Sequence, residues 1–198
     1  EWVLSMLSAL TAARIALHRF CALPLERTAR ALGQSLAALR ARGRAEAALE
    51  LLDQAREAAQ VLGIDLARTA SELAIERARA WCSLGQTEPA LREIEGLSAS
   101  SNPRLVAWVE LVRAEVARLR HETDQAFAHY DRAAELDPSV RVEAAIGRFL
   151  LLHAGGKDEE TCAALQRLAP RELEARGELE PRRRAYLESV AAMSVYRL

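Results

Sequence analysis

Apolar residues recur along this chain at intervals of three and four positions, with charged and polar residues between them. From 103 to 120 the apolar positions are Leu105, Val109, Val112, Val116 and Leu119. This spacing places the five side chains on one face of an α-helix. Valine and isoleucine are too scattered along the chain to form convincing alternating strands. The pattern therefore predicts an all-α protein.

Glycines, prolines and polar turns divide this pattern into separate helices. Asn102 or Ser101 is expected to cap the helix that starts at Pro103. The first predicted helix is either an N-terminal cap or the second helix of a repeat, and the last one either caps the chain or begins a further repeat. The predicted helices cover 2–20, 25–42, 44–62, 65–84, 87–97, 103–120, 123–136, 138–154 and 158–168, and a last helix begins at Pro181 after the charged stretch 171–180.

The clearest helix–helix turn lies at Gly85. Glycine suits the position just past a helix because a left-handed backbone costs it little. Pro89 then falls in the first turn of the following helix, where its missing N–H matters least. Ala90 is small and lets the two helices approach closely. This stretch therefore predicts two antiparallel helices joined by a tight turn.

The same arrangement recurs along the chain. A small residue follows each predicted turn, at Ala48, Ala90, Ala126 and Thr161. The spacings are about 42, 36 and 35 residues, which is typical of stacked helix-turn-helix units. The sequence therefore predicts four consecutive helix pairs.

The units share a pattern of small, aromatic and aliphatic positions. Its members are Ala126, Tyr130, Ala133 and Pro138 in the third unit, Ala78, Trp81, Leu84, Gly85, Ala90, Ile94 and Leu97 in the second, Leu32, Leu36, Leu39, Gly43, Ala48, Leu52 and Ala55 in the first, and Ile146 and Gly147 in the fourth. This pattern resembles the tetratricopeptide repeat (TPR). Leu36 departs from the family pattern, which usually has a small residue there, and the third unit has about one extra residue in its turn.

The resemblance implies a right-handed superhelical solenoid of antiparallel helix pairs, with about 9–11 helices. On this interpretation, residues 1–22 are an N-terminal capping helix or half repeat. Residues 25–168 hold about four TPR-like pairs. Residues 170–198 are a C-terminal capping helix or a truncated further repeat. The chain begins with Glu1 rather than Met, so we expect it to be part of a longer protein.

In TPR-like stacks the first helix of each pair lines a concave groove that receives a peptide or helix. Arg40, Arg79 and Arg118 recur at a constant interval and would bind carboxylates bidentately, unless the interval is accidental. The family's clamp for a C-terminal carboxylate uses Lys and Asn, and this chain lacks that set. By register, the candidate groove residues are Arg30, Gln34, Arg40, Glu72, Glu76, Arg79, Ser83, Glu115, Arg118, Arg141 and Arg148.

The net charge of −1 argues against nucleic-acid binding, because no basic field covers the chain. Charge is nevertheless uneven. Residues 11–44 are rich in arginine with a single acid, Glu26, whereas acids outnumber arginines over 46–95. This polarity either orients a charged partner or only solvates the surface.

Residues with catalytic or metal-binding potential do not fall into any known spacing. His18, His121, His129 and His153 form no HExxH motif, and no Gly-x-Ser-x-Gly occurs. Gly155-Gly156-Lys157 lacks the spacing of a phosphate loop. Arg182-Arg183-Arg184 is either a small anion site or a solvated face. We therefore expect no catalytic, metal or cofactor-binding residues and a protein that is not an enzyme.

Cysteine usage and hydropathy suggest the compartment. Cys21, Cys82 and Cys162 lie far apart without a CxxC motif, which favours a reducing cytoplasm. No apolar run is long enough to cross a bilayer. We expect a cytoplasmic protein without a membrane partner.

Two functions fit these features. The first is a non-catalytic protein-interaction scaffold that binds a protein or peptide segment, or a neighbouring domain, and forms a homodimer through a terminal helix. Arg79→Glu would then disrupt binding with helicity retained. The second is an effector-sensing arm, because the repeat length and composition are similar to the TPR arms of large ATP-dependent LuxR-type bacterial transcription activators. Its partner would be a small-molecule effector or an inhibitory protein.

Overall fold

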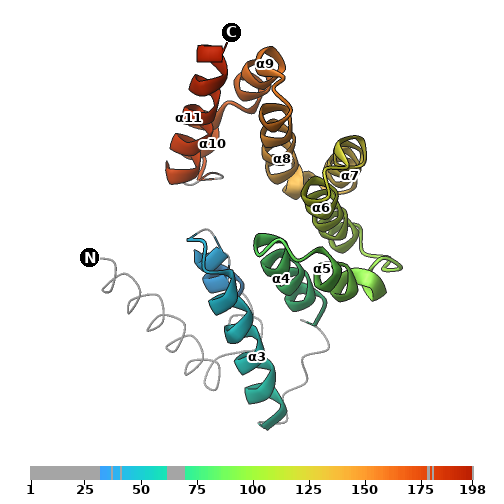
Figure 1. Cartoon of the computed structure of the whole chain (residues 1–198). Helices are drawn as coiled ribbons and strands as arrows, with labels where there is room; N and C mark the ends of the chain where they lie inside the picture. Colours follow the sequence, from blue (N-terminus) through green and yellow to red (C-terminus); the bar gives the residue numbers. More distant parts are fainter. Residues whose placement is uncertain are drawn as a thin grey trace, which may run out of the picture. The chain divides into compact units, whose positions relative to one another are not determined.

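The computed structural model describes residues 32–36, 38–40, 42–61, 70–177, 179 and 181–197. These residues form helices and turns, and no strand occurs among them, so the all-α prediction is confirmed for this part of the chain (Figure 1). Residues 32–36 and 38–40 are helical. The elements with defined bounds are α3 (Ala45–Val61), α4 (Ala70–Ser83), α5 (Thr87–Ile94), η1 (Glu95–Leu97), α6 (Pro103–Leu119), α7 (Thr123–Leu136), η2 (Pro138–Val140), α8 (Arg141–Ala154), α9 (Asp158–Leu168), α10 (Pro170–Ala175) and α11 (Pro181–Arg197).

The chain divides into two compact units, residues 1–99 and residues 100–198. We describe each unit by itself. The predicted helix 2–20, and with it the predicted capping segment 1–22, lies outside the described residues. The superhelical arrangement of all the pairs stays a prediction.

In the first unit, α4 packs against both α3 and α5. The hydrophobic core joins the helical segment 32–40 to α3 and α4 through Leu36, Leu39, Leu52 and Ala80. The buried residues of this core are leucines and alanines, so large and small side chains fill it together. Short turns at Gly43 and Gly85 connect the segment 32–40 to α3 and α4 to α5.

In the second unit, α6 pairs with α7, α7 packs on α8, and α8 packs on α9. Tyr130 lies at the centre of the core that α6, α7 and α8 share. A further core joins α8 to α10 and α11 through Phe149, Leu173 and Leu187. Helix α11 also packs against α9, so it is held by three elements of its unit.

Four helix–helix turns of the described chain share one backbone geometry. Gly43, Gly85, His121 and Gly156 all have positive φ angles, of 71°, 72°, 61° and 69°. Around Gly85, its N–H donates to the carbonyl of Cys82 at 2.9 Å, and the N–H of the next residue donates to Trp81 at 2.9 Å. The other three turns repeat both bonds. These bonds satisfy carbonyl groups that the end of a helix would otherwise leave unpaired.

Burial repeats with the turns. Five positions after each left-handed residue stand the fully buried side chains of Ala48, Ala90, Ala126 and Thr161. Seven positions before each one stand the fully buried side chains of Leu36, Ala78, Ala114 and Phe149. In each helix pair the two helices therefore pack together at the same two positions. This explains why a small residue recurs five positions after each turn.

The main difference from the predicted helices lies in the charged stretch that follows Leu168. Ala169 has a left-handed φ of 46° and ends α9, and Pro170 starts the short helix α10 instead of only ending a helix. Pro170 and Leu173 are buried, so packing holds this short helix in spite of its charged composition. At the other ambiguous boundary, the side chain of Asn102 caps α6 by accepting the N–H of Arg104 at 3.1 Å.

Candidate functional site

The predicted groove residues of the first unit bind one another. Nη2 of Arg40 donates to Oε2 of Glu76 at 2.9 Å, and Nη1 of Arg79 donates to Oε1 of the same carboxylate at 3.2 Å. Ser83 Oγ donates to the carbonyl of Arg79 at 3.0 Å. Glu76 therefore joins α4 to the segment 32–40 and occupies both arginines. Gln34 and Glu72 are exposed, and Arg30 lies outside the described residues.

In the second unit, the predicted groove residue Glu115 binds the predicted groove residue Arg118 and also Tyr130. Nε and Nη2 of Arg118 donate to its Oε2 at 3.0 and 2.7 Å, and the Tyr130 hydroxyl donates to its Oε1 at 2.6 Å. Burial raises the pKa of Tyr130, and the nearby negative charge of Glu115 raises it further. The phenol therefore stays protonated and acts as a donor to Glu115.

The remaining predicted groove residues also have partners within the second unit. Arg148 forms an ion pair with Asp131 of α7, and its Cζ lies 5.0 Å from the centroid of the Phe127 ring. Nε of Arg141 donates to the carbonyl of Ala134 at 3.2 Å. These contacts join α8 to α7, because each arginine of α8 binds a residue of α7.

The constant interval between Arg40, Arg79 and Arg118 does not follow the repeat of turns. Arg40 and Arg118 each stand three positions before a left-handed residue. The corresponding position in the second pair is Cys82, which is buried, and Arg79 stands three positions before that. A ladder of equivalent arginines is therefore not a feature of the structural repeat.

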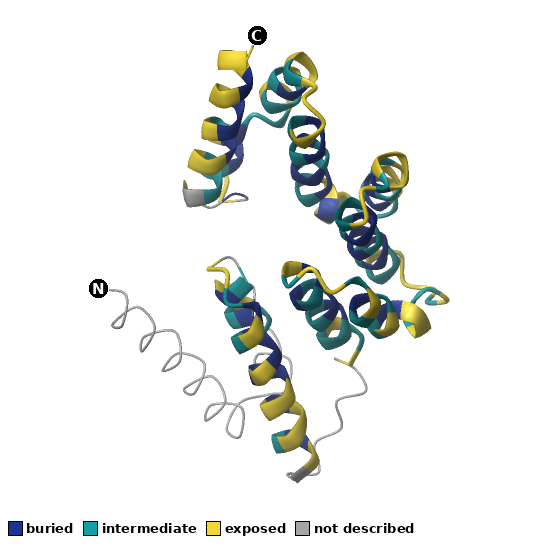
Figure 2. Ribbon diagram, viewed as in Figure 1, coloured by how far each residue is buried: buried dark blue, intermediate teal, exposed yellow. Residues whose placement is uncertain are grey.

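Helix α11 presents an apolar surface that the sequence pattern did not separate from its buried face. Leu187, Val190 and Ala191 pack into the core of the second unit. Tyr186, Met193 and Tyr196, spaced at seven and three positions, lie outside this buried stripe and are 55%, 52% and 93% exposed. Figure 2 shows exposed residues along the length of α11, on the side away from α10. On the same side of the helix stand the exposed uncharged residues Ala185, Ser189 and Ala192. We call these six residues the outer face of α11.

Ion pairs fix α11 in place. Both terminal nitrogens of Arg183 donate to Glu143 of α8, at 2.8 and 2.6 Å. Arg184 pairs with Glu174 of α10, and Nη2 of Arg197 donates to Asp158 of α9 at 2.6 Å. The bonds of Arg183 and Arg184 neutralise positive charge at the start of α11, where it opposes the helix dipole, and the bond of Arg197 holds the other end. The outer face is therefore presented by a firmly held helix.

The side chains of His153, Ser194, Arg197 and Asp158 meet where α8, α9 and α11 come together. Nδ1 of His153 lies 2.9 Å from Ser194 Oγ and 2.9 Å from Nη2 of Arg197. The aspartate binds the arginine and not the imidazole. Because Ser194 is fully buried, no substrate can reach its hydroxyl. The cluster holds the C-terminal end of α11 in place and does not form a nucleophilic triad.

A buried carboxylate in α6 was also missed from the sequence. The side chain of Glu110 is 4% exposed, and its oxygens lie 2.6 Å from Nδ1 of His129 and 2.8 Å from Nη1 of Arg113. Arg132 lies farther away, at 4.0 Å. The acid between Val109 and Leu111 was the available signal, because it interrupts an apolar stretch. Such a carboxylate is tolerated only when it is well paired.

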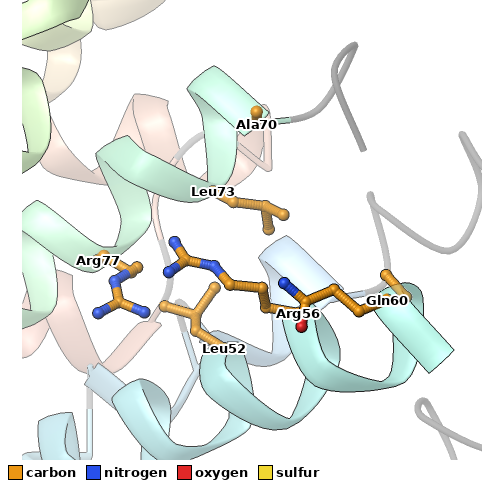
Figure 3. A pocket seen from close by; sticks show the side chains of 7 residues that line it. Leu52, Arg56, Gln60, Ala70, Leu73 and Arg77 are labelled. Carbon is orange, nitrogen blue, oxygen red and sulfur yellow. The ribbon is translucent and has the colours of Figure 1, made fainter. Parts of the chain in front are cut away.

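A cavity of about 250 Å³ lies between α3 and α4 in the first unit. Leu52, Ala59 and Leu73 give it apolar walls, and Arg56, Gln60 and Arg77 bring polar groups to it (Figure 3). Arg77 is held by Asp53 and, through Nε at 2.9 Å, by Glu93. Burial lowers the pKa of Arg77, but Asp53 and Glu93 outweigh it and the net pKa is raised. Arg77 therefore stays charged.

The described part of the chain offers no cluster of three histidine, cysteine or acidic side chains that could hold a metal ion. Cys82 and Cys162 are not in disulfides. None of the helices in the described ranges is both long and apolar enough to span a bilayer. No protein-family model, curated protein or solved structure gives a significant match to this chain.

Proposed function

We propose that this chain is a non-catalytic protein-interaction module, built from TPR-like helix pairs, and that the outer face of α11 is its principal contact surface. The observation that supports this proposal is the exposure of Tyr186, Met193 and Tyr196 on one helix. The exposed large hydrophobic side chains within the described residues are these three and Val195, all on α11. Large exposed apolar groups that lie together mark sites of protein association. Tyrosine and methionine are enriched at such sites.

The occupant that suits this surface is an apolar face of a helix in a partner protein or neighbouring domain. A helix laid along α11 would cover side chains spaced at seven and three positions with its own apolar stripe. The predicted groove charges are less suited to provide the affinity, because Glu76 and Glu115 already occupy Arg40, Arg79 and Arg118. A partner carboxylate would have to displace those pairs. In this proposal the charged groove residues orient the partner, and the outer face of α11 provides most of the binding affinity.

The second candidate function is an effector-sensing arm in a larger bacterial regulator. The cavity between α3 and α4 favours it, because a pocket with apolar walls and a few converging polar groups is typical of small-molecule sites. The two functions are compatible, since they use different units of the chain.

The interaction is tested by photo-cross-linking in cells that produce the full-length protein. p-Benzoylphenylalanine replaces Tyr196 in one strain and the exposed Gln125 of α7 in the control strain. We expect a covalent adduct with another protein or domain from position 196 and little from position 125. An adduct with the mass of two chains would identify the partner as a second copy. Equal labelling from both positions, or none from position 196, would contradict the proposal.

A further inference from the structure

The cavity between α3 and α4 contains hydrogen-bond donors that no described residue accepts. Arg77 uses Nη1 for Asp53 and Nε for Glu93, and its Nη2 has no partner within the described chain. Arg56 forms no hydrogen bond or ion pair with any described residue. Figure 3 shows Arg56 reaching from α3 into the space beside Leu73, with its guanidinium turned in the direction of Arg77. Two guanidinium groups thus bring donors to one side of the cavity.

Arg56 is exposed, and the carboxylates beside the cavity pair with Arg77 and not with Arg56. Asp53 and Glu93 both bind Arg77, so the positive charge of Arg77 is matched by its own carboxylates. Arg56 has no such carboxylate among the described residues. A guanidinium offers parallel N–H groups that fit the two oxygens of a carboxylate. A carboxylate in the cavity would therefore balance Arg56 and accept from Nη2 of Arg77.

The rest of the cavity selects for a short apolar body. Leu52, Ala59 and Leu73 line it with aliphatic groups, and Gln60 adds the only carboxamide among its lining residues. A volume of about 250 Å³ equals the share of about eight water molecules in liquid water. It suits a ligand of about six carbons.

We propose that the cavity between α3 and α4 binds a short amphipathic monocarboxylate. The carboxylate contacts the guanidinium groups of Arg56 and Arg77, and the branched or cyclic hydrocarbon part packs against Leu52 and Leu73. This site stands apart from the proposed protein interaction, and it would provide the effector of the sensing-arm alternative. Failure to bind such an acid would leave the cross-linking result at Tyr196 unaffected.

Isothermal titration calorimetry on the full chain tests the site with 4-methylpentanoate as the probe. We expect a dissociation constant of about 1 mM or lower, and at least tenfold weaker binding of 4-methylpentanamide, which is neutral and has the same shape. Decanoate is the third arm, because it distinguishes a metabolite-sized acid from a lipid-derived chain. It should bind no more tightly than the shorter acid.

Matched variants locate the binding. Arg56→Gln should weaken 4-methylpentanoate about tenfold or more, and Arg56→Lys should weaken it less because it keeps the charge. Arg92→Gln removes an exposed arginine of α5 that does not line the cavity, and it should change nothing. Equal binding of acid and amide by the unmodified protein, tighter binding of decanoate, or equal effects of Arg56→Gln and Arg92→Gln would each overturn the proposal.

Discussion

A Cβ atom on Gly147 would lie 2.3 Å from Cε1 of the Tyr130 ring, which is closer than two carbon atoms can approach. Gly147 belongs to α8 and Tyr130 to α7, so the missing side chain lets the ring occupy the interface between them. The ring cannot move aside easily, because it is fully buried and its hydroxyl is bound to Glu115 at 2.6 Å. This contact sets how closely the two helices approach.

Gly147→Ala should therefore destabilise the second unit. Overpacking costs about 1–3 kcal/mol and exceeds the gain of about 1 kcal/mol from replacing a helical glycine by alanine. Chemical denaturation followed by circular dichroism measures the loss. Gly155→Ala, at the end of the same helix, is the matched control, because its new Cβ would meet nothing closer than a backbone oxygen at 3.4 Å. If Tyr130→Leu does not relieve the cost of Gly147→Ala, the ring is not its cause.

In the turn after α6, introducing a glycine should raise the free energy of unfolding. His121 has a φ of 61°, in the region that disfavours residues with a Cβ. His121→Gly should stabilise the chain by about 0.5–1 kcal/mol, because relief of that strain outweighs the greater entropy of glycine in the unfolded chain. Gly156→Ala, at the equivalent turn with a φ of 69°, should cost about 1 kcal/mol. Changes of the same sign in both variants, measured by denaturation, would contradict a shared turn geometry.

The buried carboxylate of Glu110 depends on His129. His129→Ala should cost about 1–3 kcal/mol, because it removes a partner at 2.6 Å from a carboxylate that is 4% exposed. Arg132→Ala should change stability by no more than about 0.5 kcal/mol, since Arg132 is 68% exposed and lies 4.0 Å away. The two free energies of unfolding, determined side by side, test this assignment. If Arg132→Ala costs as much as His129→Ala, the direct contact between His129 and Glu110 is not what stabilises the buried carboxylate.

Asp137 should contribute to the loss of folding stability at low pH. Its side chain accepts the N–H of Ser139 at 2.9 Å and the Ser139 hydroxyl at 2.8 Å, and these two bonds hold its pKa below the ordinary value of 3.8. A carboxyl whose folded pKa is lowered stabilises the fold fully above its unfolded pKa. That contribution is lost as the pH falls through the folded pKa.

Asp137→Asn tests this linkage, because the amide keeps an acceptor for Ser139 but does not titrate. The unmodified chain should lose more stability than the variant as the pH is lowered from about 5 to about 2. Thermal melting across this range gives the comparison. Parallel pH profiles would show that the bonds from Ser139 do not favour the charged form.

The sequence predicted the helix pairs because glycine and small residues have a direct physical link to tight turns and close packing. Gly85 and Ala90 are examples, and both have the expected geometry or burial. His121 was not recognised as a left-handed residue, because residues other than glycine adopt positive φ angles only rarely. The short helix that starts at Pro170 was missed because its charged residues carry little apolar pattern, and buried Leu173 holds it only through tertiary contacts.

The candidate sites were less predictable than the helices. Which cation pairs with Glu76 or Glu110 depends on how neighbouring helices pack, and spacing within one helix does not contain that information. The apolar residues of α11 were visible in the sequence, but only packing shows that Leu187 is buried and Tyr196 is exposed. Likewise, the cavity beside Arg56 arises from the separation of α3 and α4.

The most direct test of the proposed interaction is the affinity for the protein or domain that cross-links to position 196. Met193→Glu and Tyr196→Glu place charge on the outer face of α11, whereas Arg79→Glu and Arg118→Glu reverse charges that the groove hypothesis requires. Apolar contact through α11 predicts at least a tenfold loss of affinity for the first two variants and about threefold or less for the others. Full affinity with Met193→Glu and Tyr196→Glu, and loss with Arg79→Glu, would contradict it and would favour the groove.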